Sequence, residues 1–247
     1  MRNDESVTMN TPRIVPLGDS AVLAEFSETL DLAINARIQR LAVAIRARRA
    51  PWIRDVVPAL GSLALHFDHA QCGPGFSPRN AAEELIGDCL AAALADSDDA
   101  ARRIEVPVCY DAEVAPDLAD VAARCGLDVD EVIARHCASP HRVLMVGFVP
   151  GHPYIGGLDA SLSVPRRTTP RSKVIAGSIA IANAQTVVYP FTIPGGWNII
   201  GRTPLRVFDA AREPPAILAP GDRVAFVPIS LERYEELARA SGGEPAA

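Results

Sequence analysis

The spacing of hydrophobic residues predicts strands and a helix near the start of the chain. Residues 13–17 and 21–26 are apolar and flank Gly18-Asp19, which predicts two strands joined by a tight turn. Apolar residues then recur every three or four positions, as on one face of a helix. These residues are Leu30, Ile34, Ile38, Leu41 and Ile45. Pro51 ends the helix, because a residue before proline disfavours the helical conformation.

A second pair of strands and a second helix follow. Residues 53–57 and 62–67 have strand-like patterns and are joined at Gly61. Ser77-Pro78 marks the start of the helix, since serine caps helices well and proline is tolerated in the first turn.

The order of these elements predicts the fold of the N-terminal part. Strand, helix, strand, strand and helix succeed one another, and residues 104–108 are available as a final strand. This is the split β-α-β pattern of ferredoxin-like domains, which we expect for residues 1–100. The short stretch 96–101, acidic and rich in alanine, is the predicted linker.

Residues 101–247 show a different pattern. Two short helices are predicted over 116–125 and 128–136, followed by apolar runs that alternate with turns rich in glycine and proline. The predicted strands are 142–148, 174–182, 186–189, 197–200, 204–208 and 223–229. Many short strands punctuated in this way predict a closed barrel or a sandwich, so we expect an α+β protein with two domains.

Composition is that of an ordinary globular protein. Of 247 residues, 49% are hydrophobic and 22% are charged, which excludes disordered, collagen-like and coiled-coil proteins. Residues 174–201 carry no charge, but their prolines, glycines and polar residues argue against a membrane helix. The polar N-terminus contains no secretion signal, so we expect a cytoplasmic protein.

The candidate metal ligands are too few for a site. The five cysteines lack a C-x-x-C spacing, and a cytoplasmic location favours free thiols. The best candidates, His136, Cys137 and His141, have no second closely spaced ligand pair. We therefore expect no metal site in this chain.

Positive charge is concentrated in the predicted barrel. Residues 140–209 contain seven basic and two acidic side chains, whereas the whole chain has a net charge of −6. Arginine suits carboxylate and phosphate because its guanidinium group binds two oxygens at once. Three uses stay open: a small anionic ligand, an acidic surface of another domain or subunit, or solvation. Nucleic acid is not expected, because the chain has no basic excess and the segment has few aromatic residues.

Three motifs in this segment point to a ligand site. They are the run from Val146 to Leu158, the pairs Pro165-Arg166 and Pro170-Arg171, and the stretch from Ala176 to Thr203. Glycine and proline turns hold the backbone rigid and bring its N–H groups close to a ligand, although barrel corners use the same residues. The single lysine, Lys173, does not belong to a G-x-x-x-x-G-K-[ST] sequence, so a P-loop is excluded.

The motifs resemble the family of the B subunit of 5-oxoprolinase, also named after the kinase inhibitor KipI and allophanate hydrolase subunit 1. The resemblance extends from residue 13 to 237 and is strongest over 147–209. It implies a cyclophilin-like β-barrel for residues 101–247, after the ferredoxin-like domain. It also implies a complex with a homologous C subunit (KipA-like) and with the A subunit of 5-oxoprolinase. This complex opens 5-oxo-L-proline to L-glutamate with ATP hydrolysis, and the isolated chain is expected to be inactive.

Two alternative functions stay open at this point. One is inhibition of histidine kinase autophosphorylation, as the name KipI indicates, and the other is a role in an amide hydrolase that acts on allophanate. The sequence does not distinguish these functions from 5-oxoprolinase activity, because the isolated chain is expected to be catalytically inactive in every case.

We predict catalytic roles for His152, Arg166 and Arg202. The arginines are expected to bind an anion, and His152, where the family usually has phenylalanine, is a general base or phosphate donor unless it serves packing. Further residues are expected to contact a small anionic substrate: Phe148, Gly151, Arg171, Gln185, Tyr189, Gly195, Gly196, Trp197 and Asn198.

Overall fold

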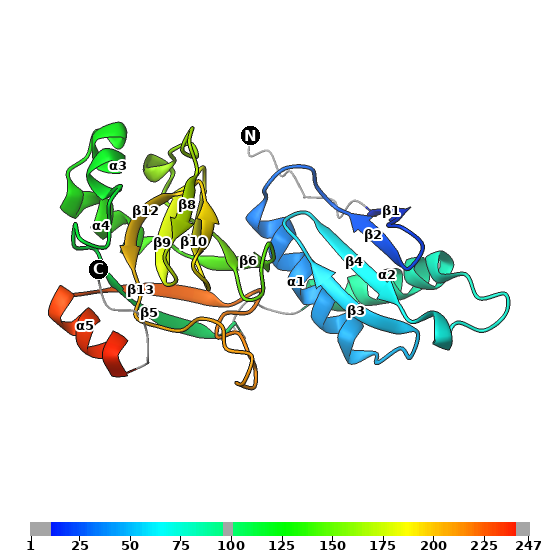
Figure 1. The fold of residues 1–247 in the computed structure, drawn as a ribbon. Coiled ribbons are helices and arrows are strands. Elements are labelled where there is room, and N and C mark those ends of the chain that lie inside the picture. Colours follow the sequence, from blue (N-terminus) through cyan, green and yellow to red (C-terminus); the bar gives the residue numbers. More distant parts are fainter. Residues whose placement is uncertain (1–10, 96–100, 241–247) are drawn as a thin grey trace, which may run out of the picture. The chain divides into compact units, whose positions relative to one another are not determined.

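The chain divides into two compact units, residues 1–98 and 99–247. The computed structural model describes residues 11–95 and 101–240, so residues 96–100 of the predicted linker lie outside the described part. Each unit has a hydrophobic core of its own, and we describe each by itself (Figure 1).

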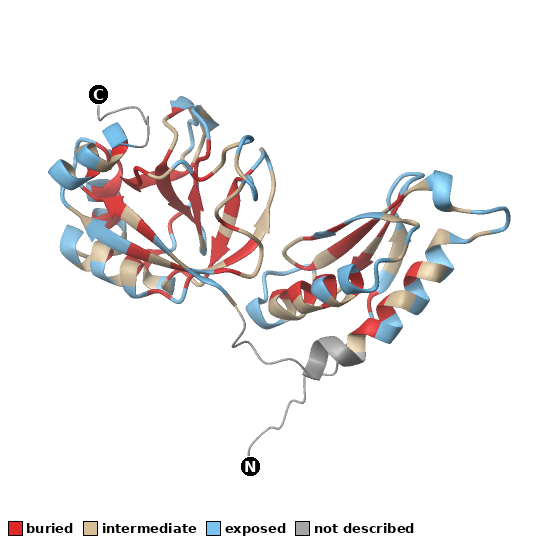
Figure 2. Ribbon diagram, turned by 90° about the horizontal axis from the view of Figure 1, so that it is seen from below, coloured by how far each residue is buried: buried red, intermediate tan, exposed pale blue. Residues whose placement is uncertain are grey.

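The N-terminal unit is a four-stranded antiparallel sheet with two helices packed on one face. The strands are β1 (Arg13–Pro16), β2 (Ala21–Glu25), β3 (Ile53–Pro58) and β4 (Ser62–Phe67), in the order β1-β2-β4-β3. The helices are α1 (Leu32–Ala47) and α2 (Pro78–Ala95), with a short 3₁₀ helix, η1 (His69–Gln71), between β4 and α2. In Figure 2 buried residues gather where the helices meet the sheet.

A side-chain cap and the apolar periodicity explain where α1 lies. Asp31 precedes the helix, and its Oδ1 accepts hydrogen bonds from the backbone N–H groups of Ala33 (2.8 Å) and Ile34 (3.0 Å). These bonds satisfy N–H groups that the helix itself leaves unpaired. The predicted apolar residues that become fully buried are Ile38, Leu41 and Ile45.

The order of elements differs from the predicted split β-α-β arrangement. Residues 104–108, expected as the last strand of this unit, lie in β5 (Arg103–Cys109), which belongs to the other unit. The place beside β2 is taken by β1, which folds back on β2 through a short turn. The prediction was wrong because an apolar strand pattern identifies a strand but not the sheet that it joins.

The C-terminal unit contains a closed barrel, one of the two architectures, barrel or sandwich, that the strand pattern predicted. Besides β5, its strands are β6 (Arg142–Val146), β7 (Pro153–Gly156), β9 (Ser178–Ala182), β10 (Gln185–Val188), β12 (Asn198–Arg202) and β13 (Arg223–Ile229). Their order is β10-β7-β6-β13-β5-β12-β9, and β9 pairs with β10 to close it. Only the β5–β13 pair is parallel among these strands.

One hydrophobic core fills the barrel and continues under two helices. All seven strands contribute side chains to it, and so do α3 (Leu118–Cys125), α4 (Val129–Ala138) and the short 3₁₀ helix η3 (Ala160–Leu162). A smaller cluster joins Tyr234 of α5 (Leu231–Ala240) to Cys109 of β5. A separate two-stranded sheet consists of β8 (Arg171–Val174) and β11 (Ile193–Gly195).

Two predicted strands take a different form. Residues 174–182 were expected as one strand, but a turn closed by the Ser178 N–H and the Ile175 carbonyl (3.2 Å) separates β8 from β9. Residues 204–208 do not form a strand, and Phe208 makes an isolated bridge to Ala216. None of the described helices is long and apolar enough to cross a membrane.

Truncation of one core residue in each unit tests this description. We expect Leu65→Ala in the N-terminal unit and Ile181→Ala in the barrel, both fully buried, to lower the free energy of unfolding by about 2–5 kcal/mol. Val43→Ala, at a residue that is 64% exposed, should change it by less than about 0.5 kcal/mol. Denaturant unfolding measures these differences, and wild-type stability of either core variant would contradict the packing.

Candidate functional site

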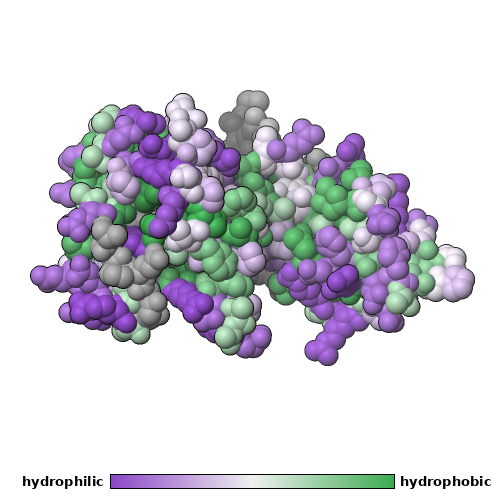
Figure 3. All heavy atoms as spheres, in the orientation of Figure 1, coloured by the Kyte–Doolittle hydropathy of each residue, from purple (hydrophilic) through white to green (hydrophobic). Residues whose placement is uncertain are grey.

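Several predicted site residues meet in one cluster of rings on the barrel unit. The aromatic cluster consists of Phe148, His152, Tyr154, Tyr189 and Trp197. The centroid of the His152 ring lies 5.6 Å from that of Phe148, 5.1 Å from that of Tyr154 and 5.3 Å from that of Tyr189. Figure 3 shows hydrophobic side chains, in green, at the barrel surface over β6, β9 and β10.

Two predicted glycines permit close packing against aromatic rings. Gly151 has a positive φ of 73°, and a Cβ there would lie 2.7 Å from the ring of Phe208. A Cβ on Gly195 would lie 2.3 Å from the hydroxyl oxygen of Tyr189. A side chain on Gly195 would displace the Tyr189 ring of the cluster, whereas one on Gly151 would displace Phe208, which lies outside the cluster.

His152 is enclosed by the cluster and neutral. Its side chain is 3% exposed, and burial lowers its pKa to about 4. Its Nδ1 atom has no hydrogen-bond partner among the described residues. A neutral, enclosed imidazole does not attract an anion by charge, so the predicted phosphate contact requires the cluster to open first.

Arg166 and Phe148 are the exposed parts of this region. The Arg166 guanidinium carbon lies 5.4 Å from the centroid of the Trp197 ring, which is a cation–π arrangement. Phe148 is 70% exposed and has a positive φ of 72°, a strained conformation for a bulky residue. Strain of this kind is concentrated at binding and catalytic sites.

A buried carboxylate pairs with two neighbouring arginines. Asp117, just before α3, is 3% exposed, and Arg171 donates to both of its oxygens (2.7 and 2.8 Å). Arg167 donates to Oδ1 (2.8 Å) and the backbone N–H of Ile199 donates to Oδ2 (2.7 Å). The predicted ligand contact of Arg171 therefore competes with an internal ion pair. We call Asp117, Arg167, Arg171 and the Ile199 N–H the Asp117 clamp.

The sequence reasoning missed Asp117. An aspartate directly before a helix is normally taken as its N-cap, but the Asp117 side chain makes no cap hydrogen bond to α3. The one feature of the sequence that pointed to a buried acid was the excess of basic over acidic residues in 140–209. Part of that excess pairs with an acid earlier in the same unit.

Two other predicted residues form polar contacts with the backbone rather than ring contacts with the aromatic cluster. Arg202 is 7% exposed, donates from Nε to the Ala176 carbonyl (3.1 Å) and stacks over Tyr234 of α5. The Asn198 side chain donates to the carbonyls of Pro165 (2.9 Å) and Ile181 (3.1 Å), so it holds the backbone. These contacts give Arg202 and Asn198 structural roles in the state described.

The remaining predicted residues are less constrained. Gln185 has a buried Nε2 without a partner among the described residues. A Cβ on Gly196 would meet Pro170 at 3.6 Å, an ordinary contact, so this position has room for a side chain.

The former metal candidates form a buried polar network instead. His136 is fully buried, its Nδ1 lies 2.8 Å from the Tyr110 hydroxyl, and its ring stacks on Phe226. Burial, followed by the nearby His141, lowers the pKa of His136 well below its usual value. No group of three possible metal ligands occurs within residues 11–95 and 101–240.

Comparison with known proteins defines the class of this chain. Residues 12–218 match the family model of the carboxyltransferase domain, subdomain C and D. The chain is 37% identical to the B subunit of 5-oxoprolinase from Bacillus subtilis over 228 residues, covering 90% of this chain and 95% of the relative. It is 38% identical to the B subunit of 5-oxoprolinase from Escherichia coli O157:H7, over 89% of this chain and 97% of that relative. The chain therefore belongs to the family of 5-oxoprolinase B subunits.

Solved structures agree with the fold. TTHA0988 superposes with a TM-score of 0.72 at 35% identity, over 85% of this chain and 40% of that longer chain. PH0987 from Pyrococcus horikoshii is 40% identical with a TM-score of 0.54, over 90% of this chain and 100% of the other. The urea amidolyase of K. lactis superposes with a TM-score of 0.69 at 19% identity, over 94% of this chain and 16% of the urea amidolyase chain. At this low identity the match supports a similar fold and nothing more.

Loss of the Asp117 carboxylate should destabilise the barrel unit. Asp117→Asn removes the charge that Arg167 and Arg171 share, and we expect a loss of about 2–4 kcal/mol in denaturant unfolding, because a buried ion network loses one partner. Asp120→Asn, at an exposed i,i+4 pair with Arg124, should cost less than about 0.5 kcal/mol. Equal stability of the two variants would rule out a structural role for the clamp.

The lowered pKa of His152 predicts a pH effect on stability. The unfolded chain takes up the histidine proton near pH 6.5 and the folded chain only near pH 4, so stability falls as the pH drops through this interval. We expect His152→Phe to reduce that fall by up to about 1.4 kcal/mol per pH unit. Denaturant unfolding at several pH values measures this change in stability. The control is His69→Gln, because His69 is exposed. Identical pH dependence in His152→Phe and wild type would contradict the burial.

Proposed function

We propose that this chain is a subunit of an ATP-dependent 5-oxoprolinase complex, which opens 5-oxo-L-proline to L-glutamate. The observation that carries the proposal is 37–38% identity to proteins named as the B subunit of 5-oxoprolinase. The alignments cover 95–99% of those relatives, so the correspondence involves nearly the whole polypeptide.

The chemistry explains why ATP is needed. A lactam carbonyl is a weak electrophile, and transfer of a phosphoryl group to its oxygen makes the carbon reactive towards water. Charge then develops on oxygen atoms, where positioned cations and N–H groups stabilise it. We place ATP in the complex as the cofactor; the lone lysine of this chain has no P-loop context, so this chain does not hold ATP through a P-loop.

Arg166 is the residue that we propose to contact the substrate. Its guanidinium lies over the Trp197 ring, and this pairing of cation and aromatic face suits a small ring that carries a carboxylate. The next residue, Arg167, is bound to Asp117 and also donates its N–H to the Gly196 carbonyl (2.8 Å). These two bonds hold the backbone beside Arg166, which reduces the freedom that it loses on binding.

We propose that the catalytic assembly requires partner subunits. This chain corresponds to 40% of TTHA0988, so in that protein the same fold is part of a longer polypeptide. We propose that a homologous C subunit (KipA-like) and an A subunit join this chain, because its relatives are named as B subunits. The isolated chain is then inactive, and the complex works in the cytoplasm.

Reconstitution tests the proposal. The purified chain is mixed with its candidate A and C subunits, and release of ADP and glutamate from 5-oxo-L-proline is measured while each component is omitted in turn. We expect release to stop without this chain. Arg166→Ala should raise KM about ten-fold, because a charge-assisted hydrogen bond is lost. Arg206→Ala, an exposed arginine of the same basic segment, should leave KM unchanged.

The alternatives have distinct outcomes in the same mixtures. A complex that assembles but ignores 5-oxo-L-proline while hydrolysing allophanate would replace the proposed substrate. Inhibition of a histidine kinase by the chain alone, without any lactamase activity in the mixture, would replace the proposed enzyme role.

A further inference from the structure

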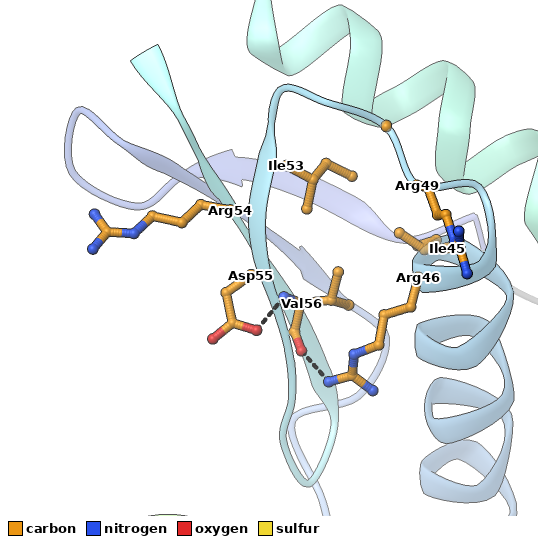
Figure 4. Close-up of a pocket in the computed structure, with 8 residues that line it drawn as sticks. Ile45, Arg46, Arg49, Ile53, Arg54, Asp55 and Val56 are labelled. Atoms are coloured by element: carbon orange, nitrogen blue, oxygen red, sulfur yellow. Dashed lines mark hydrogen bonds between the residues drawn. The ribbon is translucent and has the colours of Figure 1, made fainter. Parts of the chain in front are cut away.

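A pocket of about 270 Å³ lies in the N-terminal unit, between the end of α1 and β3 (Figure 4). Its lining is Ile45, Arg46, Arg49, Ala50, Ile53, Arg54, Asp55 and Val56, which includes none of the site residues described above. Ile45 and Val56 are buried, so part of the lining is apolar. The volume is just below the usual range of about 300–1,000 Å³ for ligand sites, which fits only a small molecule.

Positive charge in the lining is not neutralised within the described part of the chain. Three arginines line the pocket against one carboxylate, and none of them forms an ion pair with a described residue. The Asp55 carboxylate accepts a hydrogen bond from the Val56 N–H (2.7 Å). In Figure 4, Arg46 and Arg49 extend from the α1 side, whereas Arg54 extends from the opposite side of β3.

Arg46 is held in place by a backbone contact. Its Nη2 donates to the carbonyl oxygen of Val56, so the side chain spans from the last turn of α1 to β3. No other hydrogen bond of this guanidinium is found among the described residues. Its remaining N–H groups are therefore available to a ligand, and their position is fixed before the ligand arrives.

Arg49 occupies a position where glycine would be less strained. Its φ is +49°, in the left-handed region that follows many helices and normally favours glycine. A side chain in this conformation costs on the order of 1 kcal/mol. In Figure 4 the Arg49 side chain lies over the end of α1 beside Ile45, whereas the Arg46 guanidinium turns away from it to Val56. Arg49 lines the pocket and is exposed, and its guanidinium makes no hydrogen bond or ion pair with a described residue, so it can turn towards a ligand bound there.

The strand on the other side of the pocket is irregular as well. The pairing of β3 with β4 shifts between Ile53 and Asp55, so Arg54 lies in a bulge at the edge of the sheet. Bulges of this kind redirect side chains and occur often beside binding sites.

We propose that this pocket binds a small molecule with an oxyanion group, held by Arg46 and Arg49, and a short apolar part that contacts Ile45, Ile53 and Val56. The C-terminal end of α1 carries about half a negative elementary charge, which by itself repels an anion. Two guanidinium groups carry more positive charge than this, so the net charge next to the pocket still attracts an anion. The oxyanion is a carboxylate or a phosphate, since arginine binds both. This inference does not depend on the proposed 5-oxoprolinase function.

Anion titration of the full-length chain tests the proposal. Amide chemical shifts are followed by NMR at constant ionic strength, in separate titrations with inorganic phosphate and with butyrate. We expect saturable shifts confined to residues 45–56, and the tighter of the two probes identifies the class of oxyanion. A constant ionic strength is required because exposed charges respond to salt in general.

Two variants connect the binding to the arginines. Arg49→Gly should weaken binding about ten-fold or more and leave the melting temperature unchanged or higher, because glycine relieves the positive φ. Arg46→Gln, which keeps a donor for the Val56 carbonyl, should weaken binding to a similar extent. Arg79→Ala removes an exposed arginine that pairs with Glu83 on α2 and should bind as the wild type does.

Three results would overturn the proposal. They are shifts that do not saturate, shifts that spread evenly over both units, and an affinity that survives both Arg49→Gly and Arg46→Gln. Each would show that the pocket is not an oxyanion site, whatever the outcome of the oxoprolinase reconstitution.

Discussion

The buried carboxylate of Asp117 connects the segments around which the candidate site is built. It receives hydrogen bonds from Arg167, Arg171 and the N–H of Ile199, so it joins the start of α3 to the 165–171 segment and to β12. A buried carboxylate is stable only when its lone pairs are satisfied in this way. The 165–171 segment also carries Arg166, so the position of the proposed substrate-binding arginine depends on this single acid.

The same interaction reduces the positive charge of the barrel unit that is available to a ligand. Residues 140–209 have five more basic than acidic side chains, but Asp117, which lies outside that segment, pairs with two of the arginines and offsets one of their charges. Arg202 is removed from solvent by Tyr234 and the Ala176 carbonyl. Arg166 is left as an exposed arginine beside the aromatic cluster, and the anion-binding capacity of this region is smaller than the charge count indicates.

Features determined by neighbouring residues could be predicted from the sequence, and features determined by distant residues could not. The position of α1 follows from Asp31 and a repeat of apolar residues, both of which act within a few positions. The membership of β5 in the barrel depends on β13, more than a hundred residues later, and no local pattern reports it. Asp117 was missed for the same reason, since the arginines that bind it are fifty or more residues away. The glycine- and proline-rich motifs had marked Phe148, His152, Tyr189 and Trp197 as candidates, whereas their grouping with Tyr154 and the burial of His152 required the structure.

The parallel pairing of β5 with β13 has a consequence for biosynthesis. The first strand of the barrel unit lacks its parallel partner until the last strand has been made, because Arg103 pairs with Arg223 and Cys109 with Ile229. At ordinary translation rates this interval is roughly 6–24 s. During that time the inward side of β5, which includes Val106 and Val108, lacks its final covering. Until β13 closes the barrel, this edge of β5 is open to pairing with a strand of another molecule.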